Sequence, residues 1–549
     1  MGVKELWALL RSEGLVTQVQ GGEDHPQIVR EVQGKVVAVD LSQWFFQANF
    51  QPELLANFPT QEARCLKLSF ERAINFLRYE CVPVGCLDGD VPPEKRELLQ
   101  KRCLERSGYV GGGNGNSAFQ ELGNLVGQLL RALGLPVVPA PGEAEALMAA
   151  LEVAGLVDAC ATSDGDALVF GATHIYHTLR LQTMVTKQSE VVRVDMEGIR
   201  GRLGLRTGGA EALLALALIT GGDYDASGLD SVGKTGALRI IRHLLKGRAS
   251  DEGIVTRLAD ALAQAPDTFL ESLTKCTGCR HCKHASGLKG HCKHHSGRNP
   301  CPTCQLREGP CQCPFHAREE ERRLNKVVRL ANQNPGFPAR AAAAYKGYRS
   351  QRSGASIAVS QLPQQRLKWQ QRPDVAKAAG LLGVHLEWEP EKVRRKLLPL
   401  LLTWDAEQRG HAEAEFEPVR IVKLHGAGYG TEPQKDAWRY LMEWKRLSKG
   451  SQQDINHDTE WLTGKGTCTP DARSLRIDVV AHHWPALLAK FNTPAPAKPV
   501  RRPKKGLKEA EVRGMASRMQ AFLTPARKDA APADKAGRAP LQGRGLAEP

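Results

Sequence analysis

The stretch Leu135–Ala172, LPVVPAPGEAEALMAALEVAGLVDACATSDGDALVFGA, decides the fold class of this chain. Two apolar, strand-like runs, Leu135–Pro139 and Leu156–Ala161, each end at a turn followed by two acids one residue apart. Strands that alternate with helices predict an α/β fold, and ligands of such folds bind just beyond the carboxyl ends of the strands. Four carboxylates are expected to converge there: Glu143, Glu145, Asp164 and Asp166.

These four carboxylates have two interpretations. Acids at a helix start complement the helix dipole and cap free amides, and a Ser-Asp-Gly-Asp run is common in turns, so each pair alone is more often structural. Four converging anions, however, repel one another unless a divalent cation lies among them. Carboxylate oxygens suit Mg²⁺ or Mn²⁺. The presence of both pairs together favours a metal site.

The composition indicates a partner that carries negative charge. The chain has 549 residues, room for three or four domains, and its 75 Lys and Arg residues against 60 Asp and Glu residues give a formal net charge of +15. This surplus favours nucleic acid over a membrane surface. The longest apolar run, Ala212–Ile219, is too short to span a bilayer, and we expect neither a signal peptide nor myristoylation at the first residues.

Three further acids occupy comparable positions elsewhere in the chain. Asp40 follows the apolar strand Val36–Val39, Asp88 follows a second strand, and Asp223 follows a pair of glycines after a helix. An acid after a buried strand is a frequent metal ligand and also a frequent helix cap. Of the aromatic residues just after Asp40, most are expected in the core, and one could stack on a base.

Basic and glycine-rich segments accompany the acids. Lys95 and Arg102 are seven residues apart, which places both on one face of a basic helix, and spacing alone favours a solvated charged face. The run GGGNGN, residues 111–116, is expected to be a flexible loop. Downstream, GLDSVGKTGA opens a helix in a manner typical of a phosphate-binding nest. Its candidate phosphate contacts are Gly233, Lys234 and Gly236.

In their order, these segments resemble the XPG/flap-endonuclease superfamily. The matching motifs run over residues 1–245 and read MGVKELW, VAVDLS, LDGDVPPEKR, APGEAEA, ATSDGDALVFGA and ITGGDYDASGLDSVGKTGA. Further on, NPGFPARAAAAY, LKWQQRPD and LEWEPEKVRRKLLPLLLTWD resemble the GEN/Yen group of Holliday-junction resolvases. The resemblance implies a PIN-like nuclease core, in which helices flank a mostly parallel central sheet, together with a helix-turn-helix element that grips duplex phosphates.

The resemblance also implies a role for each candidate residue. Two Mg²⁺ ions, with Mn²⁺ as a substitute, would provide a hydroxide nucleophile and relieve charge on the phosphate during phosphodiester hydrolysis. Lys95 and Arg102 would be the catalytic pair that polarises the scissile phosphate, and Phe46 would meet an unpaired base. The nest would hold duplex DNA away from the cut. The implied metal ligands are Asp40, Asp88, Glu143, Glu145, Asp164, Asp166 and Asp223.

Eight of the fourteen cysteines lie in one segment, between Cys276 and Cys313. In a chain without a secretory signal, this usage indicates thiols and metal ligands rather than disulfides. Paired C-x-x-C motifs predict a Zn²⁺ site, and the insertion resembles that of plant and green-algal GEN-like proteins. A second site, built from the remaining cysteines or histidines, and a reduced basic loop without metal are the alternatives. The first site would contain Cys279, Cys282, Cys301 and Cys304.

The C-terminal part changes character. FEPVRIVKL, WRYLMEWKRL and DTEW, within residues 416–492, resemble a chromodomain, a small β-barrel with a C-terminal helix. Leu447 stands where an aromatic is usual, so a methyl-lysine cage would be incomplete and DNA contact is expected instead. The Pro/Ala/Lys-rich tail is expected to be disordered. Its KPVRRPKKGLK run fits a nuclear localisation signal, and residues 519–523 faintly resemble a peptide that binds a sliding clamp.

We therefore expect a nuclear, structure-selective endonuclease for DNA recombination and repair. It would resolve four-way junctions by paired nicks as a homodimer, and cut 5′ flaps, replication forks and other branched DNA as a monomer. The alternatives are a 5′-flap or repair endonuclease without resolvase activity, and an inactive zinc-binding chromatin scaffold. The expected regions are 1–110 and 124–222 (nuclease), 223–275 (helix-turn-helix), 276–316 (cysteine-rich insertion), 317–410 (end of the nuclease core), 416–492 (chromodomain-like) and 493–549 (tail).

Overall fold

The structure is a computed structural model, and it describes residues 3, 5–20, 25–90, 92, 95, 114–181, 189–274, 317–408, 414–426, 438–447 and 474–492. The described residues up to Lys490 form one compact unit, and Phe491 begins a second. The predictions for Arg102, for the cysteine-rich insertion and for the basic tail lie outside the described residues. In the described ranges, no helix is both long enough and apolar enough to cross a membrane.

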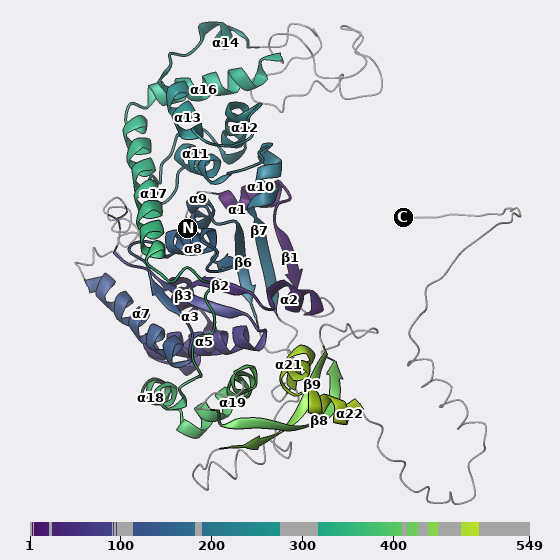
Figure 1. The fold of residues 1–549 in the computed structure, drawn as a ribbon. Coiled ribbons are helices and arrows are strands. Elements are labelled where there is room, and N and C mark those ends of the chain that lie inside the picture. The colour runs from purple at the N-terminus through teal and green to yellow at the C-terminus, as the bar shows by residue number, and fades with distance from the viewer. Residues whose placement is uncertain are drawn as a thin grey trace, which may run out of the picture. The chain divides into compact units, whose positions relative to one another are not determined.

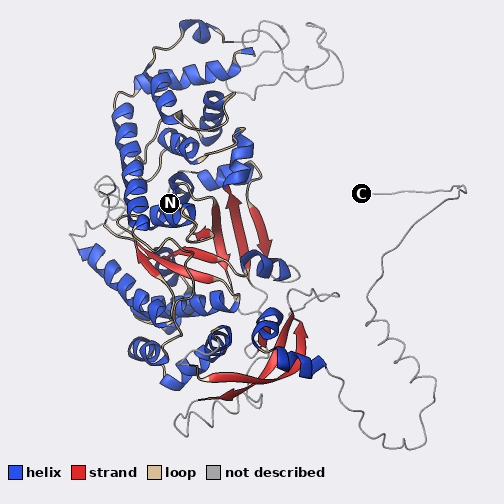
Figure 2. Ribbon diagram, in the orientation of Figure 1, coloured by secondary structure: helices blue, strands red, loops and turns tan. Residues whose placement is uncertain are grey.

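A seven-stranded sheet lies at the centre of the first unit (Figure 2). Its strand order is β1-β7-β6-β5-β2-β3-β4, with parallel pairing from β6 to β4 and antiparallel pairing where β7 and β1 are added. The prediction of a mostly parallel sheet is therefore confirmed. The strands are β1 (Thr17–Gln20), β2 (Val36–Asp40), β3 (Val82–Leu87), β4 (Val137–Pro139), β5 (Ala159–Ala161), β6 (His174–Arg180) and β7 (Glu190–Asp195).

Both faces of this sheet are covered, and every residue of the central strand β2 is buried. In β2, Val36 and Ala38 belong to one hydrophobic core and Val37 and Val39 to another, as expected when successive side chains point to opposite faces. The first core includes α1 (Leu6–Ser12), α8 (Ala144–Val153), α9 (Asp166–Phe170), α10 (Met196–Leu203), α11 (Ala210–Thr220), α12 (Lys234–Leu245), α13 (Ile254–Ala263), α16 (Glu319–Gln333) and α17 (Phe337–Ser360). The second includes α2 (His25–Val32), α3 (Leu41–Ala48), α4 (Pro52–Asn57), α5 (Gln61–Arg78), α7 (Asn114–Ala132), α18 (Val375–Leu386) and α19 (Pro390–Glu407).

One predicted loop is partly a helix. Helix α7 begins at Asn114, so the prediction of a loop over residues 111–116 is wrong for the last three of them. The apolar side chains of α7, such as Leu122, Val126 and Leu129, recur at helical spacing and are buried in the second core. That packing outweighs the poor helix propensity of Gly and Asn, which here fall in the first turn of the helix.

A smaller antiparallel sheet follows the nuclease-like core, in the order β10-β9-β8 (Figure 1). It shares a third hydrophobic core with α19, to which Leu398 and Leu401 contribute from the helix and Phe416 and Trp444 from the sheet. These strands and the helix after them lie where the chromodomain-like module is predicted, although a closed barrel stays a prediction. The elements are β8 (Phe416–Gly426), β9 (Trp438–Arg446), β10 (Ser474–Arg476), α21 (Ile477–His483) and α22 (Pro485–Asn492).

Candidate active site

The acidic residues follow four neighbouring parallel strands of the large sheet. Strands β5, β2, β3 and β4 are adjacent, so their carboxyl ends lie at one edge. From β2 the chain adds β3 and β4 on one side and β5 on the other, and such a switch point is where α/β folds place their ligand sites. Asp40 ends β2, and the other acids at these strand ends are Asp88 after β3, Glu143 after β4 and Asp164 after β5.

Asp40 and Asp88 connect the corners that carry them. Asp40 caps helix α3 by accepting a hydrogen bond from the Gln43 amide, at 3.3 Å, so the capping interpretation is correct for one of its oxygens. Asp88 accepts hydrogen bonds from the Ala144 amide, at 2.9 Å, and from the Ser42 hydroxyl. Asp88 thus holds the start of α8 beside the end of β2.

The two acid pairs of the central stretch are not used as simple caps. Glu143 is the N-cap residue of α8, but its side chain makes no capping hydrogen bond and instead pairs with the Lys95 ammonium. Asp164 Oδ1 accepts a hydrogen bond from the Asp166 amide at 3.0 Å. Asp166 Oδ1 is buried and has no hydrogen-bond partner among the residues that the structure describes. An unpartnered buried carboxylate oxygen is costly, so Asp166 Oδ1 is available to a proton or a cation.

The electrostatics of the cluster point the same way. Burial raises the pKa of Asp40 to about 8, and the charge of Asp88 adds to the effect. Burial, together with the neighbouring Asp40, raises the pKa of Glu145 well above its usual value, and burial with the neighbouring Asp164 does the same for Asp166. Carboxyl groups whose charges are disfavoured in this way bind protons or cations. The cluster is therefore a site built to receive positive charge.

Lys95 lies inside this cluster. Its ammonium pairs with Glu143 and, at 3.2 Å, with Asp223 Oδ2, and it lies 4.9 Å from the ring centre of Tyr224. Burial opposes the charge of the ammonium, but the carboxylates of Glu143 and Asp223 outweigh burial and raise the pKa of Lys95 well above its usual value. The Lys95 side chain is only 14% exposed. The solvated-face interpretation that spacing alone favoured is therefore wrong for Lys95.

The donors fit a hard divalent cation. All seven predicted ligands offer carboxylate oxygens, the type that Mg²⁺ and Mn²⁺ prefer. Within the described ranges, no three acidic, histidine or cysteine side chains are already arranged as a coordination sphere, and the Lys95 ammonium lies between Glu143 and Asp223. The unpartnered oxygen of Asp166, and the burial that raises the pKa of its carboxyl group, both favour a bound cation there. The residues present thus fit Mg²⁺ or Mn²⁺.

Sequence reasoning missed a second layer of the site. Tyr348 donates a hydrogen bond to Asp166 Oδ2 at 3.3 Å, and Gln351 Oε1 accepts one from the Glu143 amide at 3.0 Å. The hydroxyl of Tyr224 lies beside Glu143. Tyr224 directly follows a predicted ligand and could have been noticed. The other two lie on α17, about 200 residues from their partners, and no local pattern identifies them.

The predicted DNA contacts lie at the surface. Phe46 is 47% exposed and packs against Phe50 with the two rings tilted and their centres 4.5 Å apart, while Trp44 and Phe45 are buried as expected. Helix α12 begins at Lys234, so the predicted helix start is confirmed. The Lys234 ammonium pairs with the exposed carboxylate of Glu5. Gly233 is the N-cap of that helix and Gly236 lies in its first turn. Their contacts with DNA stay predictions.

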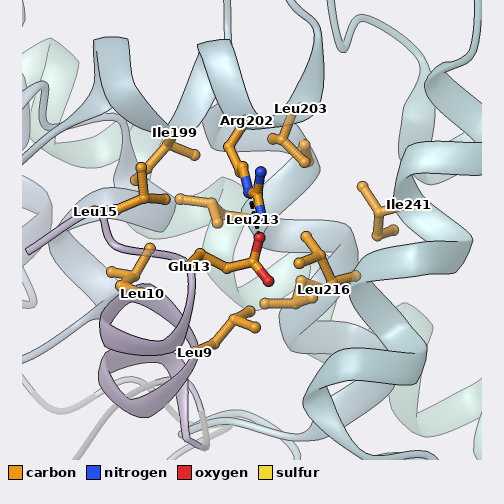
Figure 3. Close-up of a pocket in the computed structure, with 12 residues that line it drawn as sticks. Leu9, Leu10, Glu13, Leu15, Ile199, Arg202, Leu203, Leu213, Leu216 and Ile241 are labelled. Carbon is orange, nitrogen blue, oxygen red and sulfur yellow. Dashed lines mark hydrogen bonds and ion pairs between the residues drawn. The ribbon is translucent and has the colours of Figure 1, made fainter. Parts of the chain in front are cut away.

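Glu13 connects the N-terminal helix to the helices around α12. Its carboxylate accepts hydrogen bonds from Arg202 and, at 2.8 Å, from Arg242, which belong to α10 and α12. Figure 3 shows this carboxylate surrounded by apolar side chains that include Leu10 and Leu213. The pairing therefore fixes the C-terminal part of α12 against α1 and α10.

Comparison with known proteins indicates the family of this chain. The model of the XPG N-terminal domain matches residues 1–108, and that of the XPG I-region matches residues 134–223. Flap endonuclease GEN homolog 1 of Homo sapiens is 27% identical over 472 residues, which cover 83% of this chain and 48% of the human protein. The chain thus spans about half the length of that relative.

Two further comparisons concern a shorter relative and a solved structure. A crystal structure of human GEN1 in complex with Holliday junction DNA shares the fold, with a TM-score of 0.57 and 22% identity over 89% of this chain and 97% of that one. Flap endonuclease 1 of Saccharolobus solfataricus is 31% identical over 238 residues, which cover 39% of this chain and 68% of the archaeal protein. With both XPG regions matched in order and two thirds of that relative covered, the chain belongs to the XPG/flap-endonuclease superfamily.

Proposed function

We propose that this chain is a structure-selective, divalent-metal-dependent DNA endonuclease that resolves four-way junctions by paired nicks and also cuts 5′ flaps and other branched DNA. The observation that carries the proposal is the acidic cluster with Lys95 at the switch point of the sheet. Four of its acids are buried: Asp40, Glu143, Asp166 and Asp223. The names of the relatives support the substrate class, since two are flap endonucleases, one of them of the GEN type, and human GEN1 was solved with Holliday junction DNA.

In this proposal each side chain has a defined task. Two Mg²⁺ ions would be held by seven carboxylates, those of Asp40, Asp88, Glu143, Glu145, Asp164, Asp166 and Asp223. When bound, the ions activate the attacking water and stabilise charge on the phosphate. Lys95 and Arg102 contribute positive charge beside the scissile phosphate, which favours the transition state over the ground state. The raised pKa of Lys95 keeps it protonated for this role.

The remaining regions would bind DNA and direct the enzyme. The nest at the start of α12 would anchor duplex phosphates, and Phe46 would stack on the base exposed at the branch point. The three-stranded sheet after α19 would be the chromodomain-like module that adds DNA contact. The basic tail would direct the protein to the nucleus and make a weak sliding-clamp contact. We propose that the helix-turn-helix element spans residues 223–275, the chromodomain-like module residues 416–492 and the tail residues 493–549. The nuclease regions would be residues 1–110 and 124–222, the cysteine-rich insertion residues 276–316, and the end of the nuclease core residues 317–410.

The cysteine-rich insertion would hold one structural Zn²⁺ through Cys279, Cys282, Cys301 and Cys304. Protein purified without added metal should then contain about one equivalent of zinc by elemental analysis. Replacing Cys279 and Cys301 together with serine should remove that zinc and leave metal-dependent cleavage intact. A zinc content far below one equivalent in the unmodified protein would contradict the assignment.

The test of the proposed function compares a four-way junction whose four ends are all blocked with an equally labelled 5′ flap. A free 5′ end is absent from the blocked junction, so an enzyme that must pass such an end through itself cannot cut it. We expect paired, near-symmetric nicks in the presence of Mg²⁺, and products that a ligase reseals. Efficient flap cutting without paired incision of the junction would assign the chain to the flap endonucleases. Loss of both activities would favour the inactive scaffold.

A further inference from the structure

Helix α17 presents one face to the acidic cluster, although it lies far from the acids in the sequence. It packs against α8 and α11, and Figure 1 shows it running alongside α8. Gly347, Tyr348 and Gln351 lie within one helical turn of each other and all contact residues of the site. Gln351 holds the amide of Glu143, as described above. This face of α17 therefore forms a wall behind the carboxylates.

Tyr348 is the member of this wall that contacts a predicted metal ligand. Its side chain is 3% exposed, and its hydroxyl donates to Asp166 Oδ2 at 3.3 Å. The Tyr348 ring is held by the rings of Phe170 and Tyr224, with ring centres 5.6 and 4.4 Å away. A ring packed from two sides has little rotational freedom, so the direction of its hydroxyl is fixed.

The Tyr348 hydroxyl makes the two oxygens of Asp166 unequal, because it binds only one of them. Oδ2 is occupied by Tyr348, while Oδ1 has no hydrogen-bond partner in the described part of the chain. Asp164, Glu143 and Asp223 all act electrostatically on Asp166, so its carboxylate faces the cluster. A carboxylate anchored by one oxygen presents the other to an incoming cation without first losing rotational freedom.

The same helix sets the position of Tyr224 beneath Lys95. A Cβ atom at Gly347 would lie 2.4 Å from the Tyr224 ring, so the close approach of this ring to α17 requires glycine at that position. The Lys95 ammonium lies over the same Tyr224 ring, 4.9 Å from its centre. The Asp166 carboxylate thus contacts Tyr348 of α17, and the Lys95 ammonium contacts Tyr224, whose ring packs against α17.

We propose that Tyr348 is a positioning residue for the divalent cation: its hydroxyl fixes Asp166 so that the free oxygen is presented to the metal. The inference rests on the proposed function, because that function supplies the need for the metal. Tyr348 touches neither the cation nor the DNA in this scheme. Outer groups that orient metal ligands typically contribute about tenfold or more to metal affinity.

The test compares Tyr348→Phe with Tyr345→Phe in the full-length chain without DNA. Tyr345 lies on the same helix, but its ring contacts Arg349 rather than the acidic cluster, so it is a matched control. Binding of Mn²⁺ is measured by calorimetry and by the loss of the free-ion electron paramagnetic resonance signal. We expect Tyr348→Phe to weaken Mn²⁺ binding about tenfold and Tyr345→Phe to leave it unchanged.

Two further measurements make the result decisive. The Mg²⁺ concentration for half-maximal cleavage should rise by a similar factor in Tyr348→Phe, with the rate restored at high Mg²⁺. In an Asp166→Asn background, Tyr348→Phe should have no further effect on Mn²⁺ binding, because Tyr348 acts on the metal only through the Asp166 carboxylate. Unchanged Mn²⁺ affinity, an equal loss in both backgrounds, or a Tyr348→Phe chain that is unfolded at 25 °C would each overturn the proposal. Mn²⁺ binding without cleavage of branched DNA would instead refute the proposed function and leave the Mn²⁺ test of Tyr348 valid.

Discussion

At the scale of single residues, an acid at a strand end acquires its role from the groups that surround it. Asp40 and Glu143 both precede a helix, yet only Asp40 uses its side chain as a cap. Glu143 instead faces Lys95, and burial outweighs that pairing and raises the pKa of Glu143. Sequence alone left both interpretations open for each acid, because capping and metal binding select the same residue types at the same positions.

Removing one charge from this cluster should stop the chemistry and spare DNA binding. Asp164→Asn and Glu143→Gln each keep the size of the side chain but remove a metal-binding charge. We expect cleavage of a branched substrate to fall by at least about a hundredfold, with DNA affinity changed by less than about threefold, because phosphate contacts come from other residues. Single-turnover cleavage and equilibrium binding measure the two effects.

The matched control for these variants is Asp260→Asn. Asp260 is exposed on α13, outside the acidic cluster. This control should retain the parental cleavage rate. Cleavage at that rate by either cluster variant would show that the metal ligands are wrongly assigned.

At the scale of elements, the strands and their acids were predictable and the wall behind them was not. The apolar run of β2 and its terminal Asp40 are adjacent in sequence, so a local pattern identifies both. The contact of Tyr348 with Asp166 joins positions 182 apart, and no local sequence pattern in α17 predicts that contact. The register of the helix packing decides which of its side chains face the site, and that register depends on the whole core.

The pairing of Glu13 with Arg202 and Arg242 gives a prediction for helix α12. Glu13→Gln removes the charge that holds α12 against α1 and α10. We expect a lower unfolding temperature and a DNA affinity that falls roughly threefold to tenfold for flaps and junctions alike, since α12, which begins with the proposed phosphate contacts, is less firmly held. Fluorescence anisotropy and thermal unfolding measure these changes, with Glu53→Gln, exposed on α4, as the control.

This pairing also has a defined pH dependence. Burial opposes the charge of Glu13, but the hydrogen bonds from Arg242 and Arg202 outweigh it and lower the pKa of Glu13. The stabilisation is therefore present above the unfolded pKa, about 4.3, and is lost as the pH falls through the lower folded value. The difference in unfolding temperature between the parent and Glu13→Gln should shrink below that pH. A constant difference at all pH values would contradict this account.

At the scale of the whole molecule, a buried ion network attaches the small sheet to the nuclease core. Arg372 donates to Asp405 at 2.7 Å and to Glu415 at 3.0 Å, and Asp405 also accepts the amides of Glu415 and Phe416. The Asp405 side chain is fully buried. The three-stranded sheet is thus fixed to the end of α19 by charge as well as by the shared apolar core.

Breaking this network should loosen the attachment. Arg372→Met leaves the buried Asp405 carboxylate without its cation, a change that costs about 3–5 kcal/mol in comparable pairs. We expect an unfolding transition at lower temperature for the small sheet and faster proteolysis between α19 and β8. Lys377→Met, which removes an exposed ion pair on α18, is the control and should leave both measurements unchanged. Equal behaviour of the two variants would mean that the network does not fix the sheet.

The last prediction concerns the number of chains on one junction. Paired nicks cut two strands, and the described residues contain a single acidic cluster, so two copies should act together on a four-way junction. On a plasmid with an extruded cruciform, two cuts in one encounter linearise the DNA, whereas single cuts only relax it. Mixing the parent with an equal amount of Asp164→Asn at saturating protein leaves about a quarter of random pairs with two competent sites. Linear product should therefore fall to about a quarter, with about half of the plasmid converted to relaxed circles and about a quarter left uncut. A fall to only about half would mean that one copy makes both cuts.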